Sequence, residues 1–170
     1  MTLRLTLLRH AQAHSVDSCP EDFERELTKR GTREAEEIAQ RIVQRGLIPD
    51  LMLVSPADRS WATAEIVAEA CSLTEDQILA ARELYLATPE TTLRILTLHA
   101  GKSAHVLICG HNPGLSHIAS RLGPHPQPRE LPTAGIATAL FHQSSWANLL
   151  PETAQRCDMD DPESANTPWS

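Results

Sequence analysis

The sequence predicts one α/β domain, and two features of its hydrophobic pattern lead to that prediction. Short apolar runs typical of buried strands alternate with longer segments whose apolar residues recur at helical spacing. Strands that alternate with helices indicate an α/β architecture. With 170 residues, of which 41% are hydrophobic, the chain is long enough for one domain of ordinary composition.

The first predicted strand ends in an arginine and a histidine. Four leucines within residues 3–8 predict a strand that is buried on both faces, as a central parallel strand is. Arg9 and His10 follow directly, and residues 11–14 leave the strand as a loop. Open α/β sheets bind their ligands at the carboxyl ends of strands, so this cation and this imidazole are candidates for a binding site.

The other elements follow from helical spacing, apolar runs, and the prolines and glycines between them. We expect a helix capped by Thr28 or Thr32 that ends before Gly46, a strand at 51–54, a helix at 59–70, a strand at 77–80, a helix starting at Pro89, a strand at 105–109, a helix at 115–122, and strands at 136–141 and 145–150 that form a hairpin.

Residues 1–150 are expected to form the folded domain, and residues 151–170 an acidic tail. The tail holds five acidic residues against one arginine and shows no hydrophobic periodicity. A segment of this composition buries too little apolar surface to fold, so the tail is predicted to be disordered.

Charge and composition exclude several function classes. The formal net charge of −7 argues against a nucleic-acid partner, because the phosphate backbone attracts basic surfaces. No apolar run approaches the roughly 20 residues that span a membrane, and the start of the chain lacks the pattern of a signal peptide. The four cysteines form no Cys-x-x-Cys pair. We therefore expect a cytoplasmic protein with reduced thiols and no membrane contact.

Three predicted strand ends bear the residues of a phosphoryl site. The first gives Arg9 and His10, the second gives Ser55-Pro56-x-x-Arg59, and a later one gives Gly110-His111-Asn112-Pro113. If these strands are neighbours in a parallel sheet, two arginines and two histidines meet in one crevice. The planar guanidinium matches the oxygens of a phosphoryl group, and donors around those oxygens stabilise phosphoryl transfer.

His10 is the predicted nucleophile. One ring nitrogen would donate to a backbone carbonyl, and a positive pocket would lower the pKa of the imidazole, so that the other nitrogen keeps its lone pair. Attack on phosphorus would give a phosphohistidine, from which water releases phosphate. His111, if protonated, would add a third cation. Glu83 is the carboxylate best placed by sequence to protonate the leaving group.

Several motifs occur in order between Leu3 and about Leu150. They are Leu-Leu-Arg9-His10-Ala11, Leu27-Thr28-x-x-Gly31, Ser55-Pro56-x-x-Arg59-x-x-x-Thr63-Ala64, Glu83-Leu84-Tyr85, Gly110-His111-Asn112-Pro113-Gly114 and Pro132-Thr133-Ala134-Gly135. This ordered set resembles the histidine phosphatase superfamily, and most closely its small SixA-type branch, the phosphohistidine phosphatases.

The resemblance implies a phosphoglycerate-mutase-like fold, a three-layer sandwich with helices on both faces of a mostly parallel sheet. It also implies a phosphate pocket of Arg9, Arg59 and His111, a nucleophilic His10, and no metal or other cofactor. We add Asn112 to the substrate-binding residues. Ala11 stands where the superfamily usually has glycine, and we interpret it as a tolerated variant.

The expected substrate is a phosphorylated protein. Residues 86–104 have room for one helix and no larger insertion over the site, so the pocket should be open. An open pocket admits a phosphohistidine on another protein, such as a histidine phosphotransfer domain, and offers a small metabolite few remote contacts. A phosphatase of a small phosphorylated metabolite and a non-catalytic phosphate-binding adaptor are the alternatives. An adaptor would not need the nucleophile His10.

Other polar residues are interpreted as structural or solvated. The three histidines at 105, 111 and 117 span a strand, a turn and a helix, so they are not expected to converge on a metal. His14 is interpreted as a solvated loop residue. The cluster of Arg25, Lys29, Arg30 and Arg33 is interpreted as the solvated start of a helix rather than a dock for an acidic partner.

Overall fold

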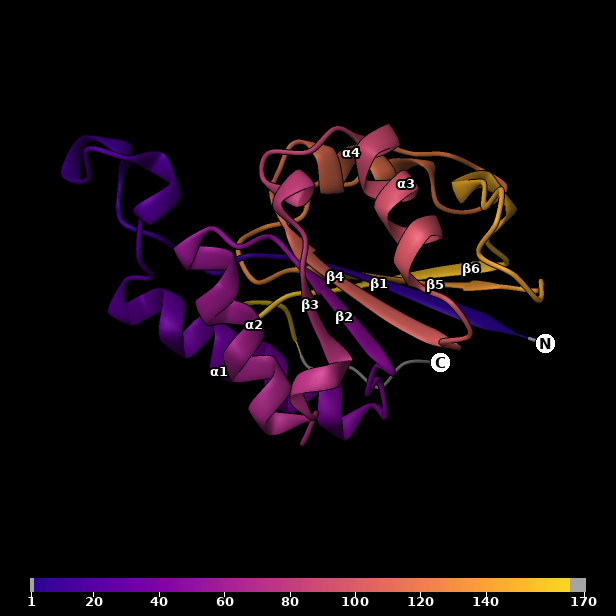
Figure 1. The fold of residues 1–170 in the computed structure, drawn as a ribbon, viewed down its shortest axis with the longest axis horizontal. Helices are drawn as coiled ribbons and strands as arrows, with labels where there is room; N and C mark the ends of the chain where they lie inside the picture. The colour runs from indigo at the N-terminus through magenta and orange to yellow at the C-terminus, as the bar shows by residue number, and fades with distance from the viewer. Residues whose placement is uncertain (1, 166–170) are drawn as a thin grey trace.

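The computed structural model describes residues 2–165, and its central layer is a six-stranded sheet (Figure 1). The strand order is β3-β2-β4-β1-β5-β6. The first four strands of this order pair in parallel with one another, whereas β5 is antiparallel to both β1 and β6. The strands are β1 (Leu3–Arg9), β2 (Leu51–Val54), β3 (Ile78–Ala80), β4 (His105–Gly110), β5 (Ile136–Phe141) and β6 (Arg156–Asp160).

Helices cover both faces of the sheet, which confirms the three-layer α/β fold (Figure 1). The helices are α1 (Lys29–Gln44), α2 (Asp58–Ala70), α3 (Pro89–His99) and α4 (Gly114–Arg121). One hydrophobic core joins α1 and α2 to the sheet, and a second joins α3 and α4 to its other face. On β1, Leu5 and Leu7 belong to the α3–α4 core and Leu8 belongs to the α1–α2 core, so this strand is buried on both faces.

The start of α1 is fixed against the loop that follows His10. Thr28, one of the two expected caps, accepts a hydrogen bond from the backbone N–H of Gly31 at 3.0 Å. A Cβ atom on Gly31 would lie 1.9 Å from the carbonyl oxygen of Gln12. Only glycine allows this close approach of helix and loop, which explains the Thr-x-x-Gly motif.

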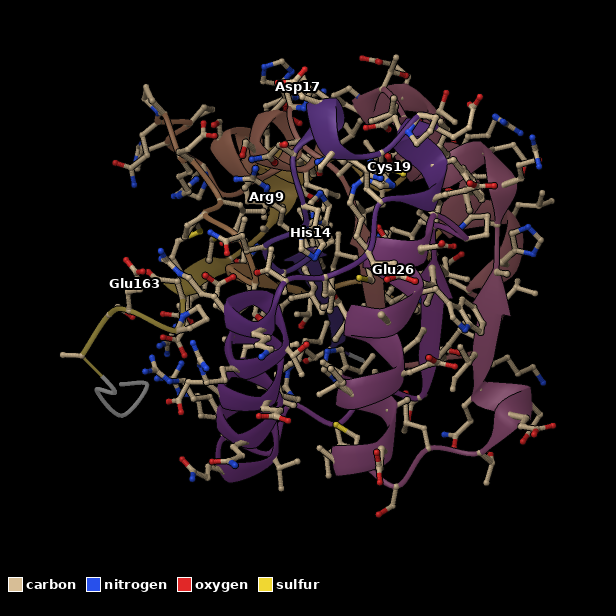
Figure 2. All side chains as sticks on the ribbon, turned by 90° about the vertical axis from the view of Figure 1, so that its left-hand side faces the viewer. Arg9, His14, Asp17, Cys19, Glu26 and Glu163 are labelled. Atoms are coloured by element: carbon tan, nitrogen blue, oxygen red, sulfur yellow. The ribbon has the colours of Figure 1, made fainter. Side chains whose placement is uncertain are left out.

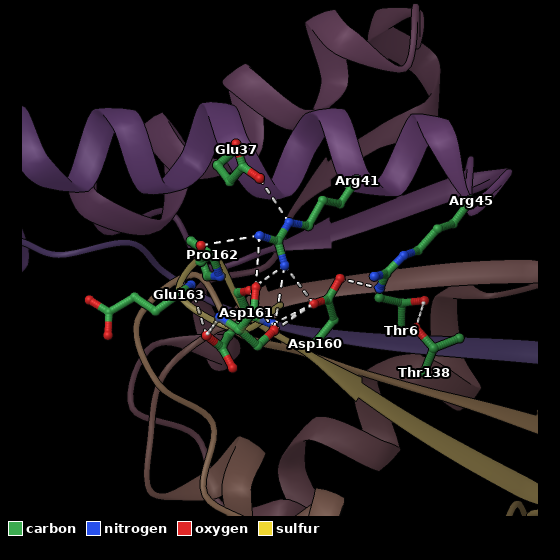
Figure 3. A network of polar contacts seen from close by, with 10 residues as sticks. Thr6, Glu37, Arg41, Arg45, Thr138, Asp160, Asp161, Pro162 and Glu163 are labelled. Atoms are coloured by element: carbon green, nitrogen blue, oxygen red, sulfur yellow. Dashed lines mark hydrogen bonds and ion pairs between the residues drawn. The ribbon is translucent and has the colours of Figure 1, made fainter. Parts of the chain in front are cut away.

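The prediction of a disordered tail from residue 151 is wrong for residues 151–165. Residues 156–160 form β6, which pairs with β5 along its whole length. Arg41 of α1 is 5% exposed and donates to the carboxylate of Asp160 at 2.9 Å and to the carbonyl oxygen of Asp161 at 2.7 Å (Figure 3). Arg45 also contacts Asp160. Because α1 and the residue that follows it supply these cations, a segment with an acidic composition is held against the domain. Residues 166–170 lie outside the described range.

The expected hairpin between residues 136–141 and 145–150 is also wrong. Residues 145–150 form an irregular connection in which Trp146 is buried and donates its indole N–H to the carbonyl oxygen of Ser103 at 2.7 Å. Trp146 and Leu149 pack in the α3–α4 core, so the hydrophobicity of this stretch does not mark a strand. The antiparallel partner of β5 comes later in the chain, at β6.

Within residues 2–165, no helix is long and apolar enough to cross a membrane. The four cysteines are unpaired.

Candidate active site

Three adjacent strands bring the predicted residues to one end of the sheet. β4 lies between β1 and β2 in the sheet, and these three strands run parallel. Arg9 and His10 at the end of β1 and His111 after β4 therefore meet near Arg59, which lies in the first turn of α2. Together they line a pocket of about 320 Å³. Figure 2 looks onto this end of the molecule, where Arg9 and His14 lie close to the centre of the view.

One ring nitrogen of His10 is hydrogen-bonded to the backbone. Its Nδ1 lies 2.8 Å from the carbonyl oxygen of Ala11, which can only accept, so Nδ1 bears the proton. Nε2 is therefore unprotonated and accepts from Nε of Arg59 at 3.3 Å. Burial and, to a smaller extent, the charges of Arg59 and Arg9 lower the pKa of His10 to about 4, against the opposing effect of the hydrogen bond to Ala11. At neutral pH this imidazole is uncharged and has a lone pair available for attack.

Ala11 is accommodated without strain. It is buried, and its backbone N–H donates to the hydroxyl of Thr63 at 3.0 Å. The non-glycine residues with positive φ in the described part of the chain do not include Ala11. The position therefore does not require the conformational freedom of glycine, and alanine is tolerated.

Arg59 presents two edges to two different neighbours. Its side chain is 1% exposed, and its Nη1 and Nη2 donate to the carbonyl oxygen and the carboxylate of Asp22 at 2.6 and 3.0 Å. Its Nε points to His10, as described above. Asp22 thus holds the outer end of the guanidinium, while the side of Nε faces the nucleophile.

Asp22 is the carboxylate of the pocket, and sequence reasoning missed it. It accepts from Nε of Arg25 at 2.9 Å and from the hydroxyl of Tyr85, in addition to Arg59. The hydrogen bond from Tyr85 and the two arginines lower the pKa of Asp22 to about 2, against an opposing effect of burial. The only signal in the sequence was the spacing of Asp22 and Arg25, which is common in irregular segments.

Two buried polar atoms of the pocket have no hydrogen-bond partner among the described residues. They are Nε of Arg9 and Nδ1 of His111. The guanidinium of Arg9 is otherwise held by a 2.9 Å bond from Nη1 to the carbonyl oxygen of Leu131. Buried polar groups are normally satisfied, so two such atoms beside one cavity indicate that a bound ligand supplies hydrogen-bond partners there.

His111 is held at its other nitrogen. Its Nε2 lies 2.7 Å from the hydroxyl oxygen of Ser55 and 3.3 Å from that of Ser60. Its ring centre is 5.3 Å from that of His10. Burial, followed by the nearby His10 and Arg59, lowers the pKa of His111 to about 3. The free protein therefore has a neutral His111, and the third cation considered above is not present.

The other two predicted residues differ in position. Asn112 lines the pocket, but its amide donates to the carbonyl oxygen of Leu131 at 2.9 Å and accepts from the backbone N–H of Ser116 at 3.2 Å. Glu83 is exposed in a 3-10 turn (Arg82–Leu84) and is not among the residues that line the pocket. The structure therefore does not bring Glu83 to the nucleophile.

The interpretation of Arg25 as part of a solvated helix start is wrong. Arg25 lines the pocket, and its Nη1 donates to the carbonyl oxygen of His14 at 2.7 Å. This bond and the one to Asp22 tie the segment before α1 to the wall of the pocket. His14 itself is exposed. In residues 2–165, no group of three or more His, Cys, Asp or Glu side chains is arranged to hold a metal ion.

Comparison with known sequences gives one family. A sequence model of the histidine phosphatase superfamily (branch 1) matches residues 5–92, which include His10 and Arg59. An uncharacterized chloroplast protein of Arabidopsis thaliana is 30% identical in an alignment of 127 residues that covers 70% of this chain. The chain spans 58% of the length of that protein.

Solved structures agree with this match. A protein of Agrobacterium tumefaciens assigned as the phosphohistidine phosphatase SixA is 32% identical, with a TM-score of 0.70 over 81% of this chain and 90% of its own. Its counterpart from Nakamurella multipartitia has a TM-score of 0.82 at 22% identity, over 96% and 98% of the two chains. The protein histidine phosphatase SixA in complex with tungstate has a TM-score of 0.78 at 23% identity, over 94% and 97%. The last two likenesses establish the fold.

Proposed function

Because the chain belongs to the histidine phosphatase superfamily, we propose that it is a phosphatase that forms a covalent intermediate on His10 and acts on protein-bound phosphohistidine. The observation that supports this proposal best is the state of His10. The bond from its Nδ1 to the carbonyl oxygen of Ala11 leaves Nε2 unprotonated in a pocket that is also lined by three arginines and one further histidine, namely Arg9, Arg25, Arg59 and His111.

The reaction has two displacement steps. In the first, the lone pair of His10 Nε2 attacks phosphorus, and the bond from phosphorus to the leaving group breaks with its electron pair on the leaving group. Nε of Arg59, which donates to Nε2 in the free protein, then donates to a phosphoryl oxygen. In the second step, water attacks phosphorus, the bond to Nε2 breaks, and phosphate is released.

The arginines stabilise charge on the transferred group. Arg9 and Arg59 line the same pocket as the nucleophile, and the unpartnered Nε of Arg9 is available to an oxygen. Donors that are fixed before the reaction stabilise the transition state without reorganising, which is the main source of catalysis in phosphoryl transfer.

The pocket favours a leaving group that departs without an acid. Its one carboxylate, Asp22, is ionised and bonded to Arg25, Arg59 and Tyr85, and Glu83 lies outside the pocket. Imidazole leaves as a neutral ring when its other nitrogen bears a proton, which a ring with an ordinary pKa of about 6.5 can take from water near neutral pH, whereas an alkyl alcohol needs a proton from the enzyme. This difference supports phosphohistidine over sugar phosphates as the substrate.

Access to the pocket supports a protein substrate. Between β3 and β4 the chain forms only the 3-10 turn at residues 82–84 and α3, so no helical insertion covers the site. A phosphorylated side chain that projects from another protein, such as a histidine phosphotransfer domain, can reach His10 from this side. The products are inorganic phosphate and the unmodified histidine.

A panel of substrates tests the proposal. A phosphohistidine protein, a phosphoserine peptide and a sugar phosphate are assayed with the wild-type protein, His10→Ala and His117→Ala. His117 is exposed on α4 and serves as the control. We expect the phosphohistidine protein to have the highest kcat/KM and only His10→Ala to abolish turnover. Equal turnover of the sugar phosphate would favour the metabolite alternative, and phosphate binding without turnover would favour an adaptor.

A further inference from the structure

The two serines that contact His111 provide a feature that the reaction above does not use. Ser55 follows β2 and Ser60 lies on α2, and both are fully buried. Their hydroxyl oxygens lie 2.7 and 3.3 Å from the same atom, Nε2 of His111. Two buried hydroxyl groups that converge on one ring nitrogen constrain where the proton of that ring can be.

The opposite nitrogen of the ring is left for the ligand. Nδ1 of His111 is buried beside the pocket and has no partner among the described residues. The oxygens of a phosphoryl group accept hydrogen bonds and do not donate them when ionised. To bind such an oxygen, Nδ1 must bear a proton.

A neutral imidazole has one donor and one acceptor, so a proton on Nδ1 requires an unprotonated Nε2. A serine hydroxyl can supply the hydrogen bond that an unprotonated Nε2 needs. The hydroxyl oxygen of Ser55 also lies 3.5 Å from the backbone N–H of Ala57, which can only donate. That contact uses a lone pair of Ser55 and leaves its proton free for Nε2.

We propose that Ser55, supported by Ser60, is a positioning residue that holds His111 as the neutral Nδ1–H tautomer, so that a neutral ring donates to the transferred phosphoryl group. This inference rests on the proposed phosphatase function. It extends that function because it assigns the donating atom of His111 and a role to the serine of the Ser-Pro-x-x-Arg motif. The arginines then provide the positive charge, and His111 provides a directed hydrogen bond.

Nuclear magnetic resonance on the ¹⁵N-histidine-labelled protein tests the tautomer directly. The two ring nitrogens have different ¹⁵N shifts in the Nδ1–H tautomer, in the Nε2–H tautomer and in the imidazolium ion. His111→Asn identifies the signals of His111, and tungstate serves as an unreactive mimic of the phosphoryl group. We expect Nδ1–H in the wild-type protein with and without tungstate. An Nε2–H ring, or an imidazolium ion in the tungstate complex, would overturn the proposal.

Kinetics of Ser55 variants provide the second test. We expect Ser55→Ala to lower kcat by about 10-fold to 100-fold with a smaller change in KM, because the donor is misdirected in the transition state. Ser55→Thr keeps the hydroxyl and should restore most of kcat and the Nδ1–H signal. Ser60→Ala, at the longer contact, should have a smaller effect. Equal activity of Ser55→Ala and the wild-type protein would refute the role of Ser55.

The two proposals fail in different ways. A wild-type protein that hydrolyses none of the phosphorylated substrates would refute the phosphatase function. An active protein whose His111 is not the Nδ1–H tautomer would refute only the role of Ser55. If Ser55→Ala does not fold, the spectrum of the wild-type protein and the kinetics of Ser55→Thr still decide the question.

Discussion

The buried nucleophile should make the protein sensitive to mild acid, and the effect of His10 can be calculated. The pKa of His10 falls from its usual value of 6.5 to about 4 in the folded protein, mainly through burial. Between these two values the unfolded chain binds a proton that the folded protein does not. Acid therefore favours unfolding in this interval, at about 1.4 kcal/mol for each pH unit.

The perturbation is His10→Asn, compared with the wild-type protein at pH 7.5 and pH 5.0. Asparagine does not titrate, and its amide nitrogen can replace Nδ1 as the donor to the carbonyl oxygen of Ala11. From pH 6.5 to pH 5.0, His10 removes about 2 kcal/mol from the free energy of unfolding of the wild-type protein. The free energy of unfolding of His10→Asn should not decrease by this amount.

Urea unfolding followed by circular dichroism measures the four free energies. The pKa values of two other buried histidines, His105 and His111, are also lowered by burial, to about 4 and about 3, so both proteins lose stability in acid. The contribution of His105 and His111 cancels when the acid-induced decrease in the free energy of unfolding of one protein is subtracted from that of the other. His117→Asn, at an exposed position on α4, should behave like the wild-type protein.

An acid-induced loss that is the same for His10→Asn and the wild-type protein, within about 0.5 kcal/mol, would refute the low pKa of His10. It would also weaken the mechanism, because a nucleophile with an ordinary pKa is partly protonated near neutral pH. If the low pKa is correct, kcat/KM of the wild-type protein should stay level from pH 7 down to about pH 5.

Four further outcomes are expected. Asp22→Asn should lower kcat by about 10-fold without raising KM, because it loosens Arg59 but removes a negative charge from the anion pocket; a rise in KM alone would contradict this. Gly31→Ala should lower the stability by about 2 kcal/mol in thermal unfolding, because the new Cβ meets the carbonyl oxygen of Gln12, and an unchanged Tm would count against that contact. Glu83→Gln should keep kcat/KM within about 2-fold, and a large loss would restore Glu83 as the leaving-group acid. Excess chelator should not reduce turnover, and a loss that added metal reverses would show a metal requirement.

The convergence of His10, Arg59 and His111 could be predicted because it depends on local rules. Each lies at or just after the carboxyl end of a strand, and parallel strands present these ends at the same edge of the sheet. The prediction needed only that each strand be a buried parallel strand and that these strands be neighbours in the sheet. The strand order confirms that β1, β4 and β2 lie side by side.

Asp22 could not be predicted in the same way. It lies in a polar segment of irregular structure, and its role depends on Arg59 and Tyr85, which are 37 and 63 positions further along the chain. No periodicity connects these three residues. Glu83 was chosen as the carboxylate of the site because it follows the third predicted strand in the sequence. In the fold its side chain is exposed.

The last strand was missed because composition and packing disagree there. Acidic residues around β6 predict disorder, since isolated buried carboxylates are costly. In the fold, Asp160 is 5% exposed and is paired with Arg41 of α1 and with Arg45, which directly follows α1, more than 100 positions earlier. The long-range ion pairs offset the cost of burial, and a composition argument does not include them.

The charges of the pocket show that recognition of a phosphoryl group does not require a positive histidine. The charged residues that line it are Arg9, Arg25, Arg59 and Asp22, which give 3 − 1 = +2. A phosphoryl group with two negative charges balances this sum, so the arginines alone match the substrate. A proton on His10 would remove the lone pair that attacks phosphorus, and a proton on His111 would add charge that the bound group does not need. Burial of the two imidazoles therefore leaves one free to act as nucleophile and the other to act as a neutral donor, while charge recognition rests with the arginines.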